Sequence, residues 1–115
     1  FVRDYFANCG PATYPVWREF QWKTETPSDS RIEFTVASAD KLSDLKTATY
    51  APLATVSGPA VVAFTGAEVN DALKAKGLPS RLYLRVAMKF VPSTDKHSAP
   101  VLNEWRQFVD CAPLE

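Results

Sequence analysis

The stretch Arg31-Ile32-Glu33-Phe34-Thr35-Val36-Ala37 decides the fold class, because polar and apolar residues alternate along it from Arg31 to Val36. Alternation with a period of two places Ile32, Phe34 and Val36 on one face of a β-strand and the polar residues on the other. A strand with one apolar and one polar face is typical of an antiparallel sheet that covers a core on one side. The stretch therefore predicts an antiparallel sheet with one face toward solvent.

Residues 81–91 alternate in the same way and predict a second long strand. Its inward face is predicted to carry Leu82, Leu84, Val86, Met88 and Phe90. Residues 101–111 are predicted as a final long strand, and residues 51–57 as a short edge strand. The apolar run 60–64 has the length of a strand, and its composition predicts burial on both faces.

Residues 16–24 form an aromatic segment that predicts the first strand of the chain. Strict alternation puts Phe20 and Trp22 on one face and Trp17 on the other. The residues before this strand include Pro11 and Pro15, which predict an irregular segment. Residues 40–50 predict a loop or a short helical turn, and residues 92–100 a polar loop.

One helix is predicted near residues 66–76. Thr65 and Glu68 have the spacing of a capping box, in which Thr65 is the N-cap. Gly77 and Pro79 supply the stop. Several strands and one short helix in a chain of 115 residues predict a single domain over residues 1–115, mainly β. The expected architecture is a two-sheet antiparallel β-sandwich, with jelly-roll connectivity as the first alternative and an immunoglobulin-like arrangement as the second.

The two cysteines, Cys9 and Cys111, bracket almost the whole chain. This spacing predicts a disulfide between them rather than a redox pair, which is normally spaced Cys-x-x-Cys. Two unpaired buried thiols are the alternative. A disulfide indicates an oxidising compartment, so we expect an extracellular or cell-surface protein, with the periplasm as a further option. The chain opens at Phe1, not at Met, and we expect a removed leader or a module of a larger extracellular protein.

The composition argues against several function classes. Thirteen basic and thirteen acidic residues give a net charge of zero, which argues against a nucleic-acid partner. One histidine and two cysteines are too few for a tetrahedral zinc site of nitrogen and sulfur ligands, and we expect no metal and no cofactor. The apolar run 60–64 is too short to insert into a membrane as a span. His97 has no nucleophile in a recognisable context beside it, so we expect no catalytic residue and no enzyme.

The remaining candidates for function are aromatic rings and arginines on exposed sheet faces and loops. Flat rings bind sugars or anchor protein partners at low entropic cost, and arginines supply hydrogen bonds at the rim of such a site. The alternative for the tryptophans is plain core packing. The candidate ligand-binding residues are Tyr14, Trp17, Tyr50, Arg85 and Arg106, with the loop 93–98 beside them.

The C-terminal third resembles a known kind of module. Tyr83-Leu84-Arg85-Val86, a polar loop, and Ala99-Pro100-Val101-Leu102 are similar to the closing hairpin of β-sandwich modules in bacterial surface and phage-associated proteins. Such modules occur in adhesin-like proteins of gliding bacteria and in type IV pilus tip assemblies. The resemblance implies a β-sandwich at a cell surface and carries over no functional residue.

Taken with the candidate residues, this resemblance suggests a non-catalytic accessory or adhesion module that binds a neighbouring domain, a surface protein or a glycan. The alternative is a carbohydrate-binding module attached to a secreted enzyme. A small hydrolase or inhibitor is the third and weakest interpretation.

Overall fold

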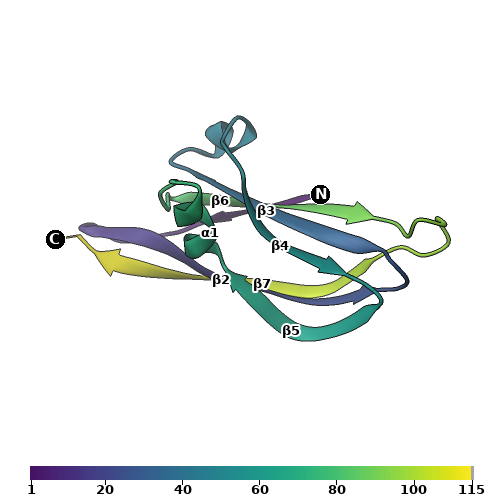
Figure 1. The fold of residues 1–115 in the computed structure, drawn as a ribbon. Helices are drawn as coiled ribbons and strands as arrows, with labels where there is room; N and C mark the ends of the chain where they lie inside the picture. The colour runs from purple at the N-terminus through teal and green to yellow at the C-terminus, as the bar shows by residue number, and fades with distance from the viewer. Residues whose placement is uncertain (115) are drawn as a thin grey trace.

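The structure, a computed structural model, describes residues 1–114 and consists of two antiparallel sheets packed face to face (Figure 1). The predicted two-sheet β-sandwich is therefore confirmed. Within residues 1–114 there are seven strands: β1 (Val2–Phe6), β2 (Thr13–Thr26), β3 (Arg31–Ala39), β4 (Ala51–Ser57), β5 (Ala60–Glu68), β6 (Tyr83–Val91) and β7 (Val101–Pro113). A 3₁₀ turn, η1 (Leu42–Lys46), and one helix, α1 (Val69–Ala75), complete the elements.

The first sheet has the order β1-β6-β3-β4, and the second has the order β5-β2-β7. As in an immunoglobulin-like sandwich, the second strand pairs with the fifth and the third strand pairs with the sixth. A jelly roll needs eight strands, and residues 1–114 form seven. The strand order departs from both expected connectivities at the ends of the chain, because β1 pairs with β6 and β7 pairs with β2.

The core lies between the two sheets and has the composition that the alternating segments predict. Ile32, Phe34 and Val36 of β3 are fully buried, as are Leu84 and Val86 of β6. The second sheet contributes Phe20 and Trp22, and the Trp22 ring stacks on Phe34 with 5.0 Å between ring centroids. The predicted inward faces of both long strands are therefore correct over most of their length.

The predicted position of Trp17 is wrong. Its side chain is only 1% exposed and belongs to the same core cluster as Phe20. The pairing of β2 with β7 shifts register between Trp17 and Phe20, which marks a β-bulge. A bulge inserts one extra residue and so resets the alternation. Strict alternation therefore predicts the wrong face for Trp17.

β2 also begins earlier than predicted, since residues 13–15 are part of the strand. Pro15 lies opposite Cys111 of β7, while β5 pairs with β2 only from Glu19 onward. Within the described residues, the part of β2 around Pro15 therefore has β7 as its neighbour on one side and no strand on the other. A proline is tolerated there because its missing N–H removes no bond of the sheet.

The predicted helix is shorter than expected and starts later. α1 covers Val69–Ala75, because β5 continues to Glu68 and pairs with β2 along that length. Thr65 is therefore a strand residue opposite Trp22 and not an N-cap; Glu68 occupies the cap without a side-chain hydrogen bond. The predicted stop is correct. Gly77 has a φ of +71°, and the Leu78 N–H donates to Leu73 O at 2.9 Å, as in a Schellman motif.

The prediction that the run 60–64 is buried on both faces is wrong. β5 is an edge strand of the second sheet, and Val61 is 81% exposed. Phe90, predicted inward, is 40% exposed, so the predicted face of this strand is not buried at the end of β6. β4 forms the predicted edge strand, and η1 is the predicted short helical turn.

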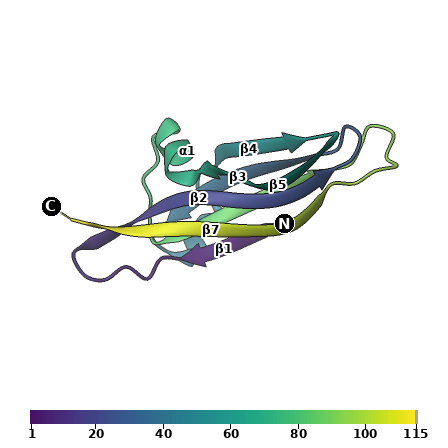
Figure 2. The same cartoon turned by 90° about the horizontal axis from the view of Figure 1, so that it is seen from below.

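The disulfide between Cys9 and Cys111 is formed, as predicted, with 5.5 Å between the two Cα atoms. It joins the segment after β1, at the edge of the first sheet, to β7 at the edge of the second. The chain ends do not meet there: the Phe1 ring lies near that of Trp105, with 6.3 Å between the ring centroids, whereas β7 ends at one end of the sandwich (Figure 2). Among residues 1–114, no helix has the length and apolarity needed to cross a membrane.

Candidate binding surfaces

The five predicted ligand-binding residues lie at four separate places. Trp17 is in the core, where its indole Nε1–H donates to Arg81 O at 2.7 Å. It therefore has no surface through which to bind a ligand. The expectation that Trp17 belongs to an exposed aromatic platform is corrected accordingly.

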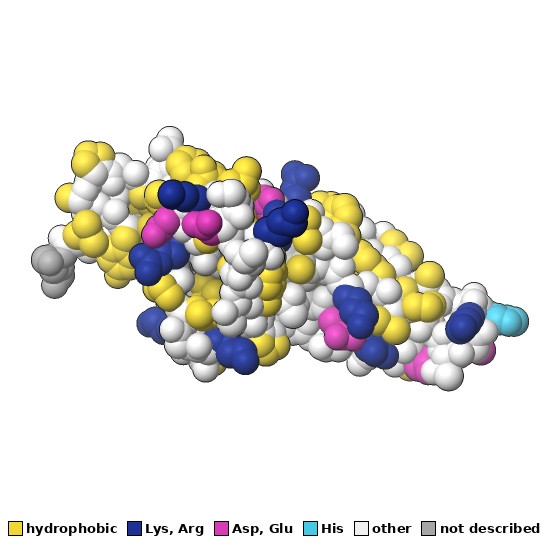
Figure 3. All heavy atoms as spheres, turned by 90° about the horizontal axis from the view of Figure 1, so that it is seen from above, with side chains coloured by type: hydrophobic (Ala, Val, Ile, Leu, Met, Phe, Trp, Pro, Cys, Tyr) yellow, Lys and Arg dark blue, Asp and Glu magenta, His cyan; other side chains and the backbone are white. Residues whose placement is uncertain are grey.

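The side chains of Arg85 and Tyr50 form hydrogen bonds within the domain. The Arg85 guanidinium donates to both carboxylate oxygens of Asp4, at 2.7 and 3.0 Å, and so links β6 to β1. Asp4, and after it Tyr50, raises the pKa of Arg85 above its ordinary value. The Tyr50 hydroxyl donates to Leu45 O at 3.1 Å. Figure 3 looks onto the sheet side that carries η1 and shows basic and acidic side chains adjacent at several places on this face.

Arg106 lies on the outer face of the second sheet, where its guanidinium carbon is 3.9 Å from the centroid of the Phe64 ring. A guanidinium over an aromatic face is a cation–π contact. Sequence reasoning missed Phe64, because its place in an apolar run predicted burial. The edge position of β5 leaves the ring at the surface instead.

Tyr14 borders a hollow of about 260 Å³ near the disulfide end of the sandwich. The ring is 43% exposed. Ser80 Oγ donates to Asn70 Oδ1 at 3.0 Å inside this hollow. The hollow thus combines one aromatic ring with amide, hydroxyl and amine groups. Its lining consists of Tyr14, Val16, Asn70, Lys74, Leu78, Pro79 and Ser80.

The loop 93–98 is held by its own hydrogen bonds and by two that Thr94 donates to Asp29 in the opposite turn. The Thr94 N–H donates to Asp29 Oδ1 at 2.8 Å, and the Thr94 hydroxyl also donates to Asp29. The Thr94 side chain lowers the pKa of Asp29, and the Ser93 side chain does the same for Asp95. His97 is at the tip of the molecule (Figure 3). Its backbone N–H donates to Asp95 at 3.0 Å.

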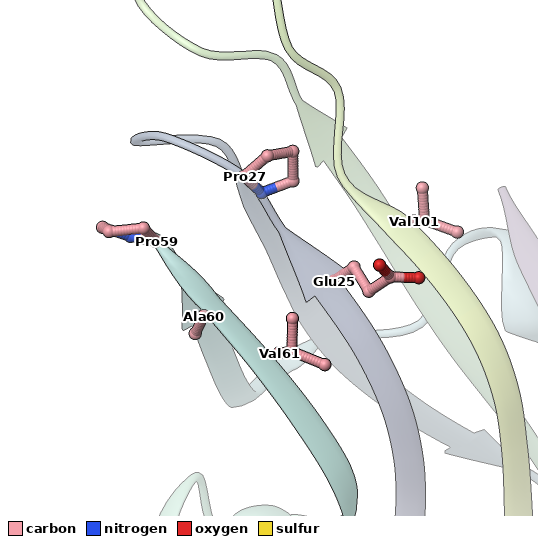
Figure 4. Close-up of a pocket in the computed structure, with 6 residues that line it drawn as sticks. All are labelled: Glu25, Pro27, Pro59, Ala60, Val61 and Val101. Carbon is pink, nitrogen blue, oxygen red and sulfur yellow. The ribbon is translucent and has the colours of Figure 1, made fainter.

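A hollow that the sequence did not predict lies on the outer face of the second sheet, with a volume of about 310 Å³ (Figure 4). Neighbouring strands carry its lining side chains side by side, because Glu25 of β2 pairs with Val61 of β5 on one side and with Val101 of β7 on the other. Glu25 is its one charged lining residue. The lining consists of Glu25, Pro27, Pro59, Ala60, Val61 and Val101.

A second apolar hollow, of about 370 Å³, opens between the edges of the two sheets. Its lining consists of Phe1, Phe90, Pro100, Val101, Leu102 and Trp105. The two hollows share Val101, so they flank the start of β7 at the end of the sandwich that carries the loop 92–100. We call the lining residues of both hollows together the Val101 surface.

No cluster of three or more histidine, cysteine, aspartate or glutamate side chains that could hold a metal ion occurs within residues 1–114. Comparison of the chain with family models, with curated proteins and with solved structures finds no match.

Proposed function

We propose that this domain is a non-catalytic accessory or adhesion module that binds a protein partner through the Val101 surface. The observation that carries the proposal is the pair of apolar hollows that meet at Val101. The centres of protein interfaces are depleted in charge and enriched in aromatic residues. The Val101 surface has this composition, with Trp105 and Phe90 in its lining and Glu25 as its one charged side chain.

The exposure of these side chains also supports a partner. Val61 is 81% exposed and Val101 46% exposed, although both are apolar. A single exposed apolar residue is ordinary, but a contiguous group around two hollows marks an interaction site. The Arg106–Phe64 contact lies on the same outer sheet face and adds two residue types that are enriched at protein interfaces.

The proposed location is extracellular or at a cell surface. The support is the disulfide, because disulfides persist in oxidising compartments. The resemblance of the C-terminal strands to bacterial surface modules agrees with this location.

Site-specific photo-crosslinking tests the proposal. The photoreactive residue p-benzoylphenylalanine replaces Val61 or Phe90 in the Val101 surface, and Leu42 in η1 serves as the matched control because it too is an exposed apolar residue. In the extracellular fraction of the source organism, we expect the two surface positions, and not Leu42, to crosslink one defined protein.

That protein is then purified and titrated with the domain. Val61→Asp and Val101→Asp are each expected to weaken binding about tenfold, and Leu42→Asp to leave it unchanged. Equal loss from Leu42→Asp, or crosslinks of the same protein from all three positions, contradicts the proposed surface.

Carbohydrate binding is the second candidate, and the Tyr14 hollow is the observation that favours it. A partly exposed ring beside the polar groups of Asn70, Lys74 and Ser80 provides both a stacking face and hydrogen bonds for a sugar. A glycan array with the wild-type domain and Tyr14→Ala tests this. Specific glycan binding that Tyr14→Ala abolishes and Val61→Asp leaves intact favours this function over the first.

A further inference from the structure

Glu25 is the one charged side chain in a row of three residues that crosses the second sheet. It lies in β2 between Val61 of β5 and Val101 of β7, which are its partners in the two strand pairings. Paired residues on neighbouring strands share a face of the sheet, and Figure 4 shows the Glu25 carboxylate between the two valine side chains. The carboxylate therefore has an apolar neighbour on each side.

The Glu25 carboxylate has no cationic partner within residues 1–114. None of the ion pairs among these residues includes it. Glu104, a carboxylate of β7, differs in that it lies opposite Lys23 of β2. The hydrogen bond that the Glu25 carboxylate does accept comes from Asn103, whose Nδ2 donates to Glu25 Oε2 at 3.1 Å. This bond holds the carboxylate in place and does not neutralise its charge.

The hollow around this carboxylate has the chemistry of a site for one positively charged side chain. The other lining side chains belong to two prolines, one alanine and two valines, and none of them carries a hydrogen-bonding atom. An ionised carboxylate accepts hydrogen bonds and donates none, so the lining side chains offer nothing to an anion. The volume of about 310 Å³ is at the lower limit of small-molecule sites, roughly 300–1,000 Å³, and suits a single long side chain.

We propose that the partner protein inserts an arginine side chain into this hollow, with its guanidinium on the Glu25 carboxylate and its aliphatic stem against Val61 and Val101. The stem of an arginine packs on apolar surface while its charged head pairs with a carboxylate. The planar fork of the guanidinium matches a carboxylate with two hydrogen bonds and is more weakly hydrated than an ammonium, which favours arginine over lysine. The inference rests on the proposed function and names the side chain by which the partner is recognised.

The test is an NMR titration of the domain with the peptide acetyl-Ala-Val-Arg-Val-Ala-amide. Saturable shifts are expected at the backbone amides of Val61 and Val101. The same peptide with citrulline, the neutral isostere of arginine, is expected to bind about tenfold more weakly. Glu25→Gln is expected to weaken the arginine peptide by the same factor and to leave the citrulline peptide unchanged, because the charge pair is then already lost. Glu104→Gln, the matched control, removes the same charge from β7 and is expected to leave the binding of both peptides unchanged.

Four results overturn the arginine site: no saturable shifts, equal binding of the arginine and citrulline peptides, equal binding of a lysine peptide, or equal losses from Glu25→Gln and Glu104→Gln. The crosslinks from Val61 and the Val61→Asp titration still decide the proposed function by themselves. If they succeed while the peptide test fails, the Val101 surface binds a partner that does not use arginine in this hollow. If they fail, the surface itself is wrong.

Discussion

Asp29 and Asp95 are the two residues that fix the loop 93–98 at the end of the sandwich. Both carboxylates accept hydrogen bonds from this loop, Asp29 from Thr94 and Asp95 from the His97 N–H. Hydrogen bonds to the charged form of a carboxyl group lower its pKa, which is the direction at both residues. The loop beside the Val101 surface is therefore ordered by charge-assisted hydrogen bonds rather than by apolar burial.

The contribution of these two carboxylates to the stability of the fold depends on pH. A lowered pKa means that each carboxylate stabilises the fold above its unfolded pKa, near 3.9, and that the contribution is lost as the pH falls through the folded value. Titration of the side-chain carboxyl carbons by ¹³C NMR is expected to give midpoints below 3.9 for both. Thr94→Val removes the first cause of the Asp29 shift and is expected to raise that midpoint. A midpoint for Asp29 that Thr94→Val leaves in place would contradict the assignment.

Leu84 and Arg85 are neighbours in β6 with opposite roles. Leu84 is fully buried between the sheets, and Leu84→Ala is expected to lower the free energy of unfolding by about 2–5 kcal/mol. Arg85 forms a partly exposed ion pair with Asp4, and Arg85→Ala is expected to cost about 1 kcal/mol or less. Urea unfolding of both variants measures the difference. A larger loss for Arg85→Ala would mean that β6 is turned the other way.

At the scale of the element, Glu68 marks the junction where β5 becomes α1. It lies opposite Glu19 of β2, and its Oε1 is buried without a hydrogen bond, with Arg18 Nη1 at 3.8 Å. Burial is the main cause that raises the pKa of Glu68 above its ordinary value. The ionised side chain therefore destabilises the fold. The protonated side chain contributes stability below the unfolded pKa, and this contribution is lost as the pH rises through the folded pKa.

Replacing this carboxylate is expected to stabilise the domain at neutral pH. Glu68→Gln should raise the free energy of unfolding at pH 7 and change it little at about pH 3, where Glu68 is protonated in both states. Urea unfolding at the two pH values checks this, with Glu19→Gln as the control on the opposite strand. A variant that is less stable than the wild type at pH 7 would show that the Arg18 contact outweighs the burial of the charge.

The elements also show which features of the molecule were predictable from the sequence. Period-two alternation was sufficient for most of β3 and β6, because these two strands pair with each other without a register shift. It failed for Trp17, where a bulge decides the face. The burial predicted from the apolar run 60–64 failed for Val61, where the edge position of β5 decides exposure. The order of apolar and polar residues within one segment predicts neither a bulge nor a sheet edge, because both depend on which distant strands pair. The Val101 surface was missed for the same reason: its hollows form between residues that only the pairing brings together.

At the scale of the whole molecule, the Cys9–Cys111 disulfide joins the edges of the two sheets across a sequence separation of 102 residues. Closing so long a loop restricts the unfolded chain, and replacing both cysteines by serine is expected to cost about 2–4 kcal/mol. The measurement is urea unfolding of the double variant beside the wild type. An unchanged free energy of unfolding would show that the sandwich does not depend on this connection.

We propose that the domain binds its protein partner at the loop end of the sandwich, through the Val101 surface. The most direct measurement is amide hydrogen exchange on the domain alone and in complex with the crosslinked partner. Binding at the Val101 surface is expected to slow exchange in residues 60–62, 89–91 and 100–102, which carry the two hollows. Slower exchange confined to Tyr14 and residues 70–80, around the hollow at the other end, would contradict it.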